Sequence, residues 1–219
     1  MKILGIDSST DRLGIGLADE NQILAESLLD SMREHASRIV GMIDDVLKRG
    51  NIEKSELEGI AVALGPGSFT GLRVGLAVAK GLSFALKIPI VGISTFEVIS
   101  QRLIPEYPKF ALSSIVRKGE LFLYRHSESS KIPDDIIIIS QDELAVQAGD
   151  IPVGMIGREP DNWRNTFSKT IDASKTCVSG GELAQIGTAM IRDNKFHDSI
   201  ELEPLYIAPS QAEEKFGRK

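Results

Sequence analysis

The chain has 219 residues, 42% of them hydrophobic, and a formal net charge of -6 at pH 7. This length is enough for one large domain or two small ones with a sizeable core, and the composition is that of a globular protein. The acidic balance argues against a basic nucleic-acid surface, because phosphate binding requires clustered Lys and Arg side chains.

The chain carries few side chains that bind metals or form covalent links. Cys177 is the single cysteine, so an internal disulfide is excluded, and His35, His126 and His197 lie too far apart for a local ligand pattern. The N-terminal residues resemble neither a signal nor a transit peptide. No stretch reaches the roughly 18 uninterrupted apolar residues of a membrane helix. We therefore expect a cytoplasmic protein with no membrane partner.

The first half of the chain predicts strands alternating with helices. Apolar runs at 3–7, 13–18 and 23–29 predict an antiparallel meander, and 60–64 and 90–93 predict two further strands. Apolar residues at three- and four-residue steps predict a first helix within 31–49 and a second over 69–86.

A change in composition around Pro105 and Pro108 predicts a domain boundary between residues 101 and 109. Beyond it we expect strands near 111–116, 121–125, 136–139 and 153–157, and a helix at 182–191. This gives an N-terminal unit of residues 1–104, completed by 205–219, and a smaller C-terminal α/β unit of residues 105–204.

Two polar turns have the composition of ligand-binding turns. Asp7 ends the first strand, where it could position a phosphate and a metal, or could simply start a turn by accepting a bond from its own backbone. The turn Gly65-Pro66-Gly67-Ser68-Phe69-Thr70-Gly71 opens a helix, where free N–H groups favour anions. It lacks the Lys-Ser/Thr pair of a Walker A loop. The alternative is a tight turn in which Ser68 or Thr70 caps the helix.

The second predicted helix is apolar or small nearly all round, with Arg73 and Lys80 as polar exceptions. A surface helix is polar on one face, so this one needs cover on both sides. Gly71, Gly75 and Ala79 repeat every four residues and form a flat ridge for the close approach of another helix. The cover is either a second layer of the same domain or a partner protein, whose interface would bury on the order of 1,000 Å².

Two further groups admit a functional interpretation. His35, at the start of the first helix, could act as a general base, but a lone histidine there is more often a cap or an interface contact. Ser179, Gly180 and Gly181 open the last predicted helix and could contact a nucleotide. A plain helix-start turn explains these three residues equally well.

The chain resembles the bacterial TsaB (YeaZ) family in three motifs along nearly its whole length. They are Ile3-Leu4-Gly5-Ile6-Asp7-Ser8-Ser9-Thr10, the turn and helix from Gly65 to Gly75 with Ala79-Lys80-Gly81-Leu82, and Pro204-Leu205-Tyr206-Ile207. The central motif is the specific one. The resemblance implies an α/β, actin-like ASKHA fold with two ribonuclease-H-like domains, whose mixed sheets are flanked by helices. It also implies a role in making threonylcarbamoyladenosine next to the tRNA anticodon.

The resemblance further implies a non-catalytic scaffold with several partners. In that family a TsaD-type subunit transfers the threonylcarbamoyl group and a TsaE-type subunit is an ATPase. This chain would form a heterodimer with the TsaD-type subunit through its first two helices and meet tRNA indirectly. When alone, it should cover the same surface by forming a homodimer, since an exposed apolar patch of this size is a liability. ATP and a metal ion are expected on the partner subunits and not on this chain. The implied interface residues are Arg33, His35, Ile39, Gly71, Leu72, Val74, Gly75, Val78 and Ala79.

The catalytic relatives carry a His-x-x-x-His metal pair that this chain lacks. Thr95 and Ile99 stand at the matching positions, and neither replaces an imidazole. Ile115 stands where relatives often have an aspartate. We therefore expect no catalysis by this chain, with Asp7 and the Ser179–Gly181 turn as the weak candidates for nucleotide contact. The alternatives are a small-molecule kinase or ATPase of the same superfamily and an M22-type metallopeptidase.

Overall fold

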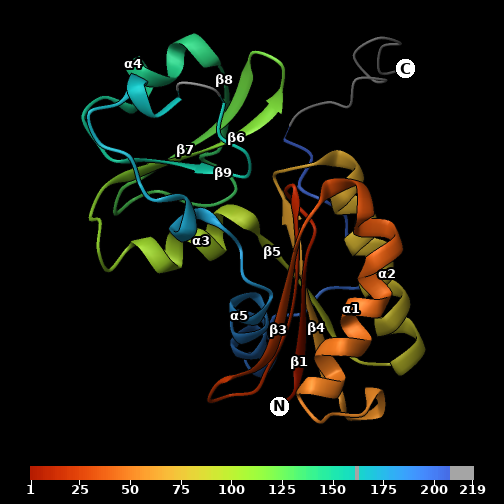
Figure 1. Ribbon diagram of the computed structural model, residues 1–219. Helices are drawn as coiled ribbons and strands as arrows, with labels where there is room; N and C mark the ends of the chain where they lie inside the picture. The colour runs from red at the N-terminus through yellow and green to blue at the C-terminus, as the bar shows by residue number, and fades with distance from the viewer. Residues whose placement is uncertain (161–162, 208–219) are drawn as a thin grey trace.

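The structure is a computed structural model that describes residues 1–160 and 163–207 (Figure 1). Two β-sheets are formed by successive parts of the chain. The first has the strand order β3-β2-β1-β4-β5 and the second has the order β8-β7-β6-β9. The strands of the first sheet are β1 (Ile3–Asp7), β2 (Arg12–Ala18), β3 (Ile23–Asp30), β4 (Gly59–Gly65) and β5 (Ile90–Ser94). Those of the second are β6 (Phe110–Arg117), β7 (Glu120–His126), β8 (Ile137–Ser140) and β9 (Val153–Ile156).

The two sheets are built on one pattern. In each, three strands form an antiparallel meander, and a later strand pairs in parallel with the first of them, β4 with β1 and β9 with β6. A parallel partner requires a crossover connection, which α1 and α4 help to supply. The strands predicted from apolar runs are confirmed, with ends that differ by one or two residues.

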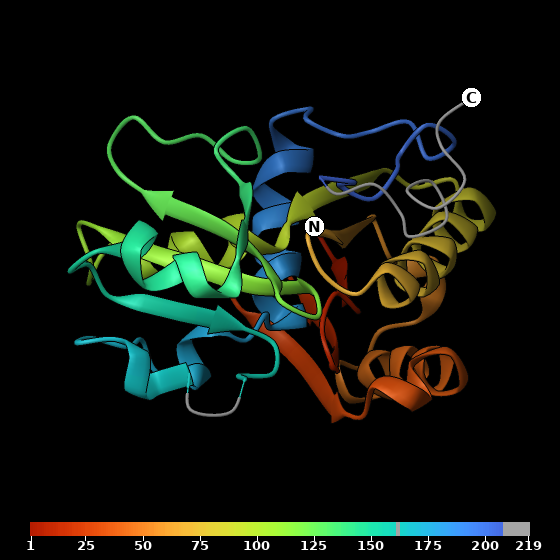
Figure 2. The same ribbon diagram turned by 90° about the horizontal axis from the view of Figure 1, so that it is seen from above.

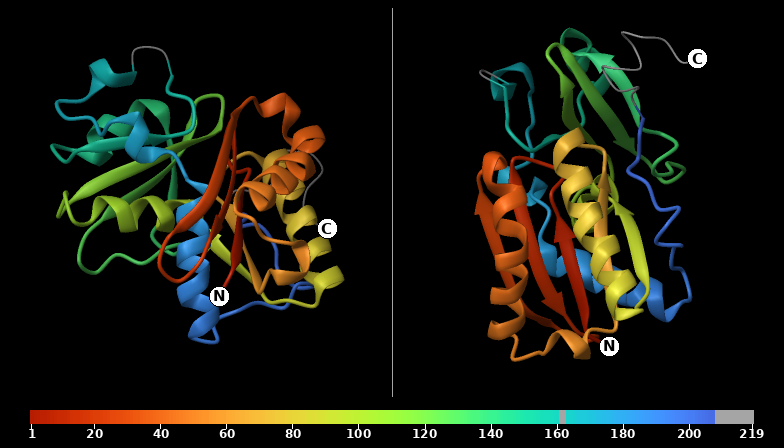
Figure 3. Two further views of the ribbon diagram at one scale, coloured as in Figure 1. Left: turned by 60° about the horizontal axis from the view of Figure 1, so that its bottom comes forward. Right: turned by 90° about the vertical axis from the view of Figure 1, so that its right-hand side faces the viewer.

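Helices cover both faces of the first sheet. α1 (His35–Arg49) and α2 (Phe69–Leu86) lie side by side on one face, and α5 (Gly180–Arg192) lies on the other (Figures 2 and 3). The predicted bounds of α2 are confirmed, and α1 begins at His35 after a short 3-10 turn. α4 (Leu144–Ala148) packs on the second sheet, and its five residues are too few for a periodic sequence signal.

α5 requires a correction to the predicted division of the chain. It falls within 105–204, yet it packs on β1 and β2 of the first sheet. Glycines make this contact possible, since a Cβ added at Gly16 would lie 2.0 Å from the Gly181 nitrogen and one at Gly5 2.0 Å from the Gly180 oxygen. The chain therefore returns to the first unit after the second sheet. Most of the predicted completion by 205–219 lies outside the described residues.

α3 (Thr95–Leu103) joins the two units through a shared core. Its buried residues Phe96 and Ile99 belong to one apolar cluster that includes Val91 of β5 and Phe110 and Phe122 of the second sheet. At its end, Arg102 forms an ion pair with Glu182 of α5. The units are thus held together by packing as well as by the chain connection.

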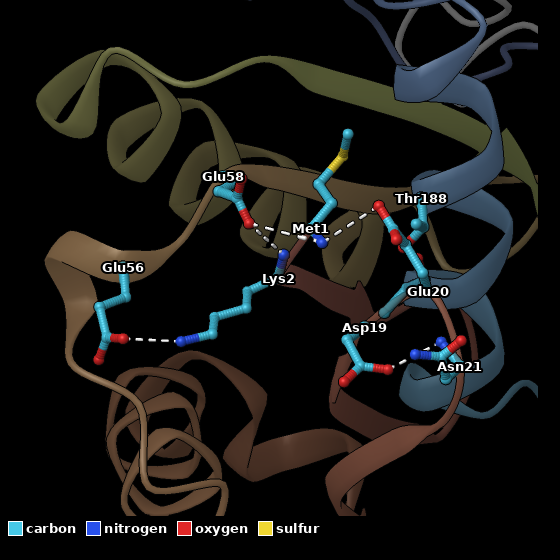
Figure 4. A network of polar contacts seen from close by, with 9 residues as sticks. Met1, Lys2, Asp19, Glu20, Asn21, Glu56, Glu58 and Thr188 are labelled. Carbon is cyan, nitrogen blue, oxygen red and sulfur yellow. Dashed lines mark hydrogen bonds and ion pairs between the residues drawn. The ribbon is translucent and has the colours of Figure 1, made fainter.

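Ion pairs at the edge of the molecule hold the start of β1 in place (Figure 4). The Met1 ammonium nitrogen lies 3.3 Å from Glu20 Oε1 and 3.7 Å from Glu58 Oε2, and Lys2 Nζ lies 2.7 Å from Glu56 Oε1. Such partly exposed pairs are worth at most about 1 kcal/mol each. They lie at the opposite end of β1 from Asp7, so they contribute nothing to the polar turns described next.

Candidate functional site

Asp7 forms a turn at the end of β1. The side chain is fully buried and its Oδ1 accepts a bond of 3.0 Å from the Ser9 backbone N–H. Burial raises the pKa of the carboxyl to about 6, and the bonds from Ser9 oppose that rise. The structure thus shows Asp7 in the turn-forming role that the sequence left open as an alternative.

The 65–71 turn packs against the β1–β2 turn. The Ser68 N–H donates to the Ser9 carbonyl at 2.6 Å, and the Ser8 hydroxyl donates to the Gly71 carbonyl at 2.8 Å. Ser68 Oγ accepts from the Gly71 N–H at 3.2 Å, which confirms the predicted cap. A Cβ at Gly67 would lie 2.1 Å from the Ser9 oxygen. These glycines therefore serve close packing of two turns, and the Ser68 and Gly71 N–H groups are already bonded within the chain.

The predicted ridge of small residues on α2 faces its own sheet. Gly71, Gly75 and Ala79 are buried, and a Cβ at Gly75 would lie 2.1 Å from Ser8 Oγ. The expectation that this ridge meets a partner helix is therefore wrong. Its physical role is to bring α2 close to the end of β1.

A second row of α2 residues is exposed to solvent. Phe69, Arg73, Ala77, Gly81 and Ala85 follow at four-residue steps and are all exposed. A Cβ at Gly81 would meet no atom within 4 Å. We define the outer face as the surface formed by two sets of exposed residues. They are Phe69, Arg73, Ala77, Gly81, Phe84 and Ala85 of α2 and Val40 and Gly41 of α1.

The outer face is apolar around a flat centre. Phe84 is 78% exposed and Val40 57%, and Gly41, like Gly81, has open space where a Cβ would be. Among the described helices α2 alone is long and apolar enough to cross a membrane by length and composition, which is weak evidence because core helices share those features. Its inner residues pack on the sheet, and the apolar area of the outer face remains exposed to solvent.

The predicted interface residues fall into two groups. Arg33 is exposed, and Val74 and Val78 are half-buried. The other six are buried in the chain and support the helices from within: His35, Ile39, Gly71, Leu72, Gly75 and Ala79. Burial is the largest influence on His35 and lowers its pKa, whereas Asp11 beside it acts in the opposite direction.

The Ser179–Gly181 turn is occupied by packing contacts. Ser179 Oγ lies 2.5 Å from Glu26 Oε2 and accepts from the Glu182 N–H as the cap of α5. Gly180 and Gly181 are buried against β2. The plain helix-start interpretation accounts for these contacts.

One hollow between the two units is small. It measures about 30 Å³ and is lined by Thr10, Arg12, Gly157, Thr176 and Cys177 among others. Ligand sites for cofactors usually measure 300–1,000 Å³. Thr95 and Ile99 are buried in α3, and the described residues contain no cluster of three or more His, Cys, Asp or Glu side chains that could hold a metal.

One feature of the outer face was not predicted from the sequence. Arg73 Nε donates to the Tyr206 hydroxyl at 3.1 Å, and its guanidinium carbon lies 3.7 Å from the centre of the Phe69 ring. Tyr206 belongs to a motif on which the family resemblance rests, but it lies 133 residues after Arg73, its partner on α2, in the sequence. No local pattern could have revealed it.

The comparisons with known proteins agree with one another. Residues 22–187 match the family model of TsaD, tRNA N6-adenosine threonylcarbamoyltransferase. The chain is 33% identical to the tRNA threonylcarbamoyladenosine biosynthesis protein TsaB of Haemophilus influenzae, over 94% of this chain and 93% of that protein. It is 26% identical to TsaB of Bacillus subtilis, over 99% of this chain and 98% of that protein. The match to TsaB of Escherichia coli, 35% identical, spans 46% of this chain and only 43% of that protein.

The solved structure of YeaZ from Pseudomonas aeruginosa superimposes with a TM-score of 0.75, at 22% identity, over 94% of this chain and 100% of that one. This likeness shows the fold. Fold and site together define an actin-like α/β protein of two ribonuclease-H-like units, whose exposed feature is a helical face. Sequence similarity to TsaB relatives over nearly the full length completes the assignment: the chain belongs to the TsaB (YeaZ) family.

Proposed function

We propose that this chain is a non-catalytic scaffold subunit in the threonylcarbamoylation of the adenosine next to the tRNA anticodon. It pairs with a TsaD-type transferase through its outer face. The relatives are named as tRNA threonylcarbamoyladenosine biosynthesis proteins, which supports the pathway. The observation that carries the pairing is the row of exposed residues at four-residue steps on α2. This row has small residues at its centre, and aromatic side chains lie near its ends.

The geometry of this row suits a helix partner. Helices pack with their axes 8–10 Å apart, and the smaller the side chains at the contact, the closer they approach. Ala77 and Gly81 keep the centre of the face flat, while Phe69 and Phe84 add apolar area at its ends. Two helices from each protein then form a bundle, and an interface of standard size buries roughly 800 Å² on each partner.

The proposed chemistry belongs to the partners. The Ser179–Gly181 turn, which is packed against the first sheet, supports a chain that binds no nucleotide. Residues Thr95 and Ile99 support the same view, because they supply no metal ligand. We propose that ATP and a metal ion act on the TsaD-type and TsaE-type subunits, that tRNA is met indirectly, and that the assembly is cytoplasmic. When alone, the chain covers its outer face by forming a homodimer.

Substitution of one exposed alanine tests the proposal. Ala77→Arg places a long cation at the centre of the outer face, and we expect co-purification with the TsaD-type subunit to be lost, with at least a hundredfold weaker binding, which is about 3 kcal/mol. Ala189→Arg is the matched control, because Ala189 is an exposed alanine on α5, across the sheet. Both variants should unfold at the wild-type temperature. If Ala77→Arg still co-purified, the proposed interface would be wrong.

A further inference from the structure

A hollow on the second unit plays no part in the proposed function. It measures about 760 Å³ and is lined by residues of β7, the start of β8, the loop that joins them, and α4. Figure 1 shows where these elements lie in the second unit. This volume falls within the range of small-molecule sites. It lies in the second unit, which contributes no residue to the outer face.

Part of the lining of the hollow is apolar. Leu123 of β7 and Ala148 of α4 are buried, whereas Val146 is 83% exposed and Ile137 is 48% exposed. Each exposed apolar side chain leaves area in water that a ligand would cover, at about 25 cal/mol per Å². The hollow thus offers a surface for the apolar body of a molecule.

The lining also carries the cations Arg125 and Lys109, and Arg125 is held in place by the chain. The Arg125 guanidinium donates to the Gln147 carbonyl at 2.9 Å. A guanidinium has five N–H donors, so this bond leaves others for a ligand. His126 is stacked on Phe110 at 4.7 Å between ring centres, and its Nδ1 lies 3.2 Å from the Tyr124 hydroxyl. Lys109 also lines the hollow.

The loop after β7 adds hydroxyl groups. Ser127 Oγ and Ser130 Oγ are 2.8 Å apart, and Ser130 donates to the Arg125 carbonyl at 2.9 Å. The carboxylate in the lining, Asp135, accepts a bond of 2.5 Å from the Lys131 backbone N–H. Two cations against one occupied carboxylate make the lining positive, in a chain whose formal net charge is -6.

We propose that this hollow binds a small organic anion, a molecule with a phosphate or carboxylate group attached to an apolar body. The anionic group lies against Arg125 and Lys109, and the apolar body lies on Val146 and Ile137. This site is independent of the pairing through the outer face, and either can fail without the other.

Anilinonaphthalene sulfonate is a suitable probe, because it is an aromatic anion whose fluorescence rises in apolar surroundings. We expect saturable binding of one molecule, with amide NMR shifts at His126 and Val146. Arg125→Gln should weaken binding roughly tenfold, since a charge-assisted hydrogen bond is lost. Val146→Asp should abolish it. Lys118→Gln is the matched control, in the β6–β7 turn at the other end of these strands, and should change binding less than twofold.

Competition identifies the anionic group. Displacement of the dye by adenosine monophosphate but not adenosine would support a phosphate ligand, and displacement by octanoate but not octanol would support a carboxylate. Three results would overturn the proposal: shifts confined to α1 and α2, unchanged binding by both Arg125→Gln and Val146→Asp, or uncharged compounds that compete as well as the anions. Thermal unfolding of each variant separates loss of binding from loss of the fold.

Discussion

Two rows of small residues run along α2, and they have opposite roles. Gly71, Gly75 and Ala79 form the inner row, where the backbone of the β1–β2 turn and the Ser8 hydroxyl fill the space that side chains would occupy. Ala77 and Gly81 lie in the outer row, where nothing fills it. Small residues at four-residue steps therefore indicate close approach in both rows. What approaches is part of the same chain on one side and, as we propose, a partner on the other.

The largest expected effect comes from putting the same bulky residue into each row. Gly75→Leu would force atoms into the position of Ser8 Oγ, which lies 2.1 Å from where a Cβ at Gly75 would be, and should destabilise the fold by at least about 4 kcal/mol. Gly81→Leu meets open space and should stabilise the helix by up to about 1 kcal/mol. Urea unfolding measures both.

The same pair separates folding from pairing. Gly81→Leu should remain folded but fail to co-purify with the TsaD-type subunit, because the side chain fills the flat centre of the outer face. If Gly75→Leu folded normally, the inner row would not be part of the core. If Gly81→Leu lost its folded signal, the outer row would not be a free surface.

The difference between the rows also marks the limit of the sequence. The period and composition of residues 69–86 were sufficient to predict α2 and its need for cover on two sides. They could not say which small residues face inward, because that depends on the contact with Ser8. Ser8 hydrogen-bonds to Gly71, which is more than sixty residues further along the chain. Gly75 was accordingly assigned to a partner when it belongs to the core.

The same limit applies to α5. Its apolar period predicted a helix near 182–191, and the structure confirms one at Gly180–Arg192. Its place on the first sheet follows from the fit of Gly180 and Gly181 against Gly5 and Gly16, which are more than 160 residues away in the chain. The Asp7 turn was predicted better, because a side chain bonding to the backbone two residues on is a local event.

A smaller effect is expected where the inner row meets β1. The pKa of Asp7 is raised by burial from 3.8 to about 6 in the folded chain. The folded state therefore binds the proton more tightly than the unfolded state. Stability linked to this group is fully present below pH 4, decreases as the pH rises to about 6, and is lost above it. A shift of about two pKa units corresponds to about 3 kcal/mol.

Asp7→Asn should remove that penalty and keep the turn, since the amide oxygen can still accept from the Ser9 N–H. We expect the variant to be more stable than wild type by about 2–3 kcal/mol at pH 8 and nearly equal to it at pH 4. Urea unfolding at the two pH values checks this. Equal stabilisation at both would mean that the buried carboxyl does not titrate in this range.

The smallest expected effect lies at the N-terminal end of the outer row. Arg73 connects Phe69 with Tyr206, so it ties the segment after α5 to α2. Arg73→Met keeps most of the side-chain stem but loses the hydrogen bond and the cation–π contact, which at an exposed site is worth about 0.5–1 kcal/mol. We expect a slightly lower unfolding temperature and faster amide exchange at Leu205 and Tyr206. Arg38→Met, at an exposed arginine of α1, is the control and should change neither. Unchanged exchange at Tyr206 would show that Leu205, whose N–H donates to the Leu64 carbonyl at 2.9 Å, holds the segment without help from Arg73.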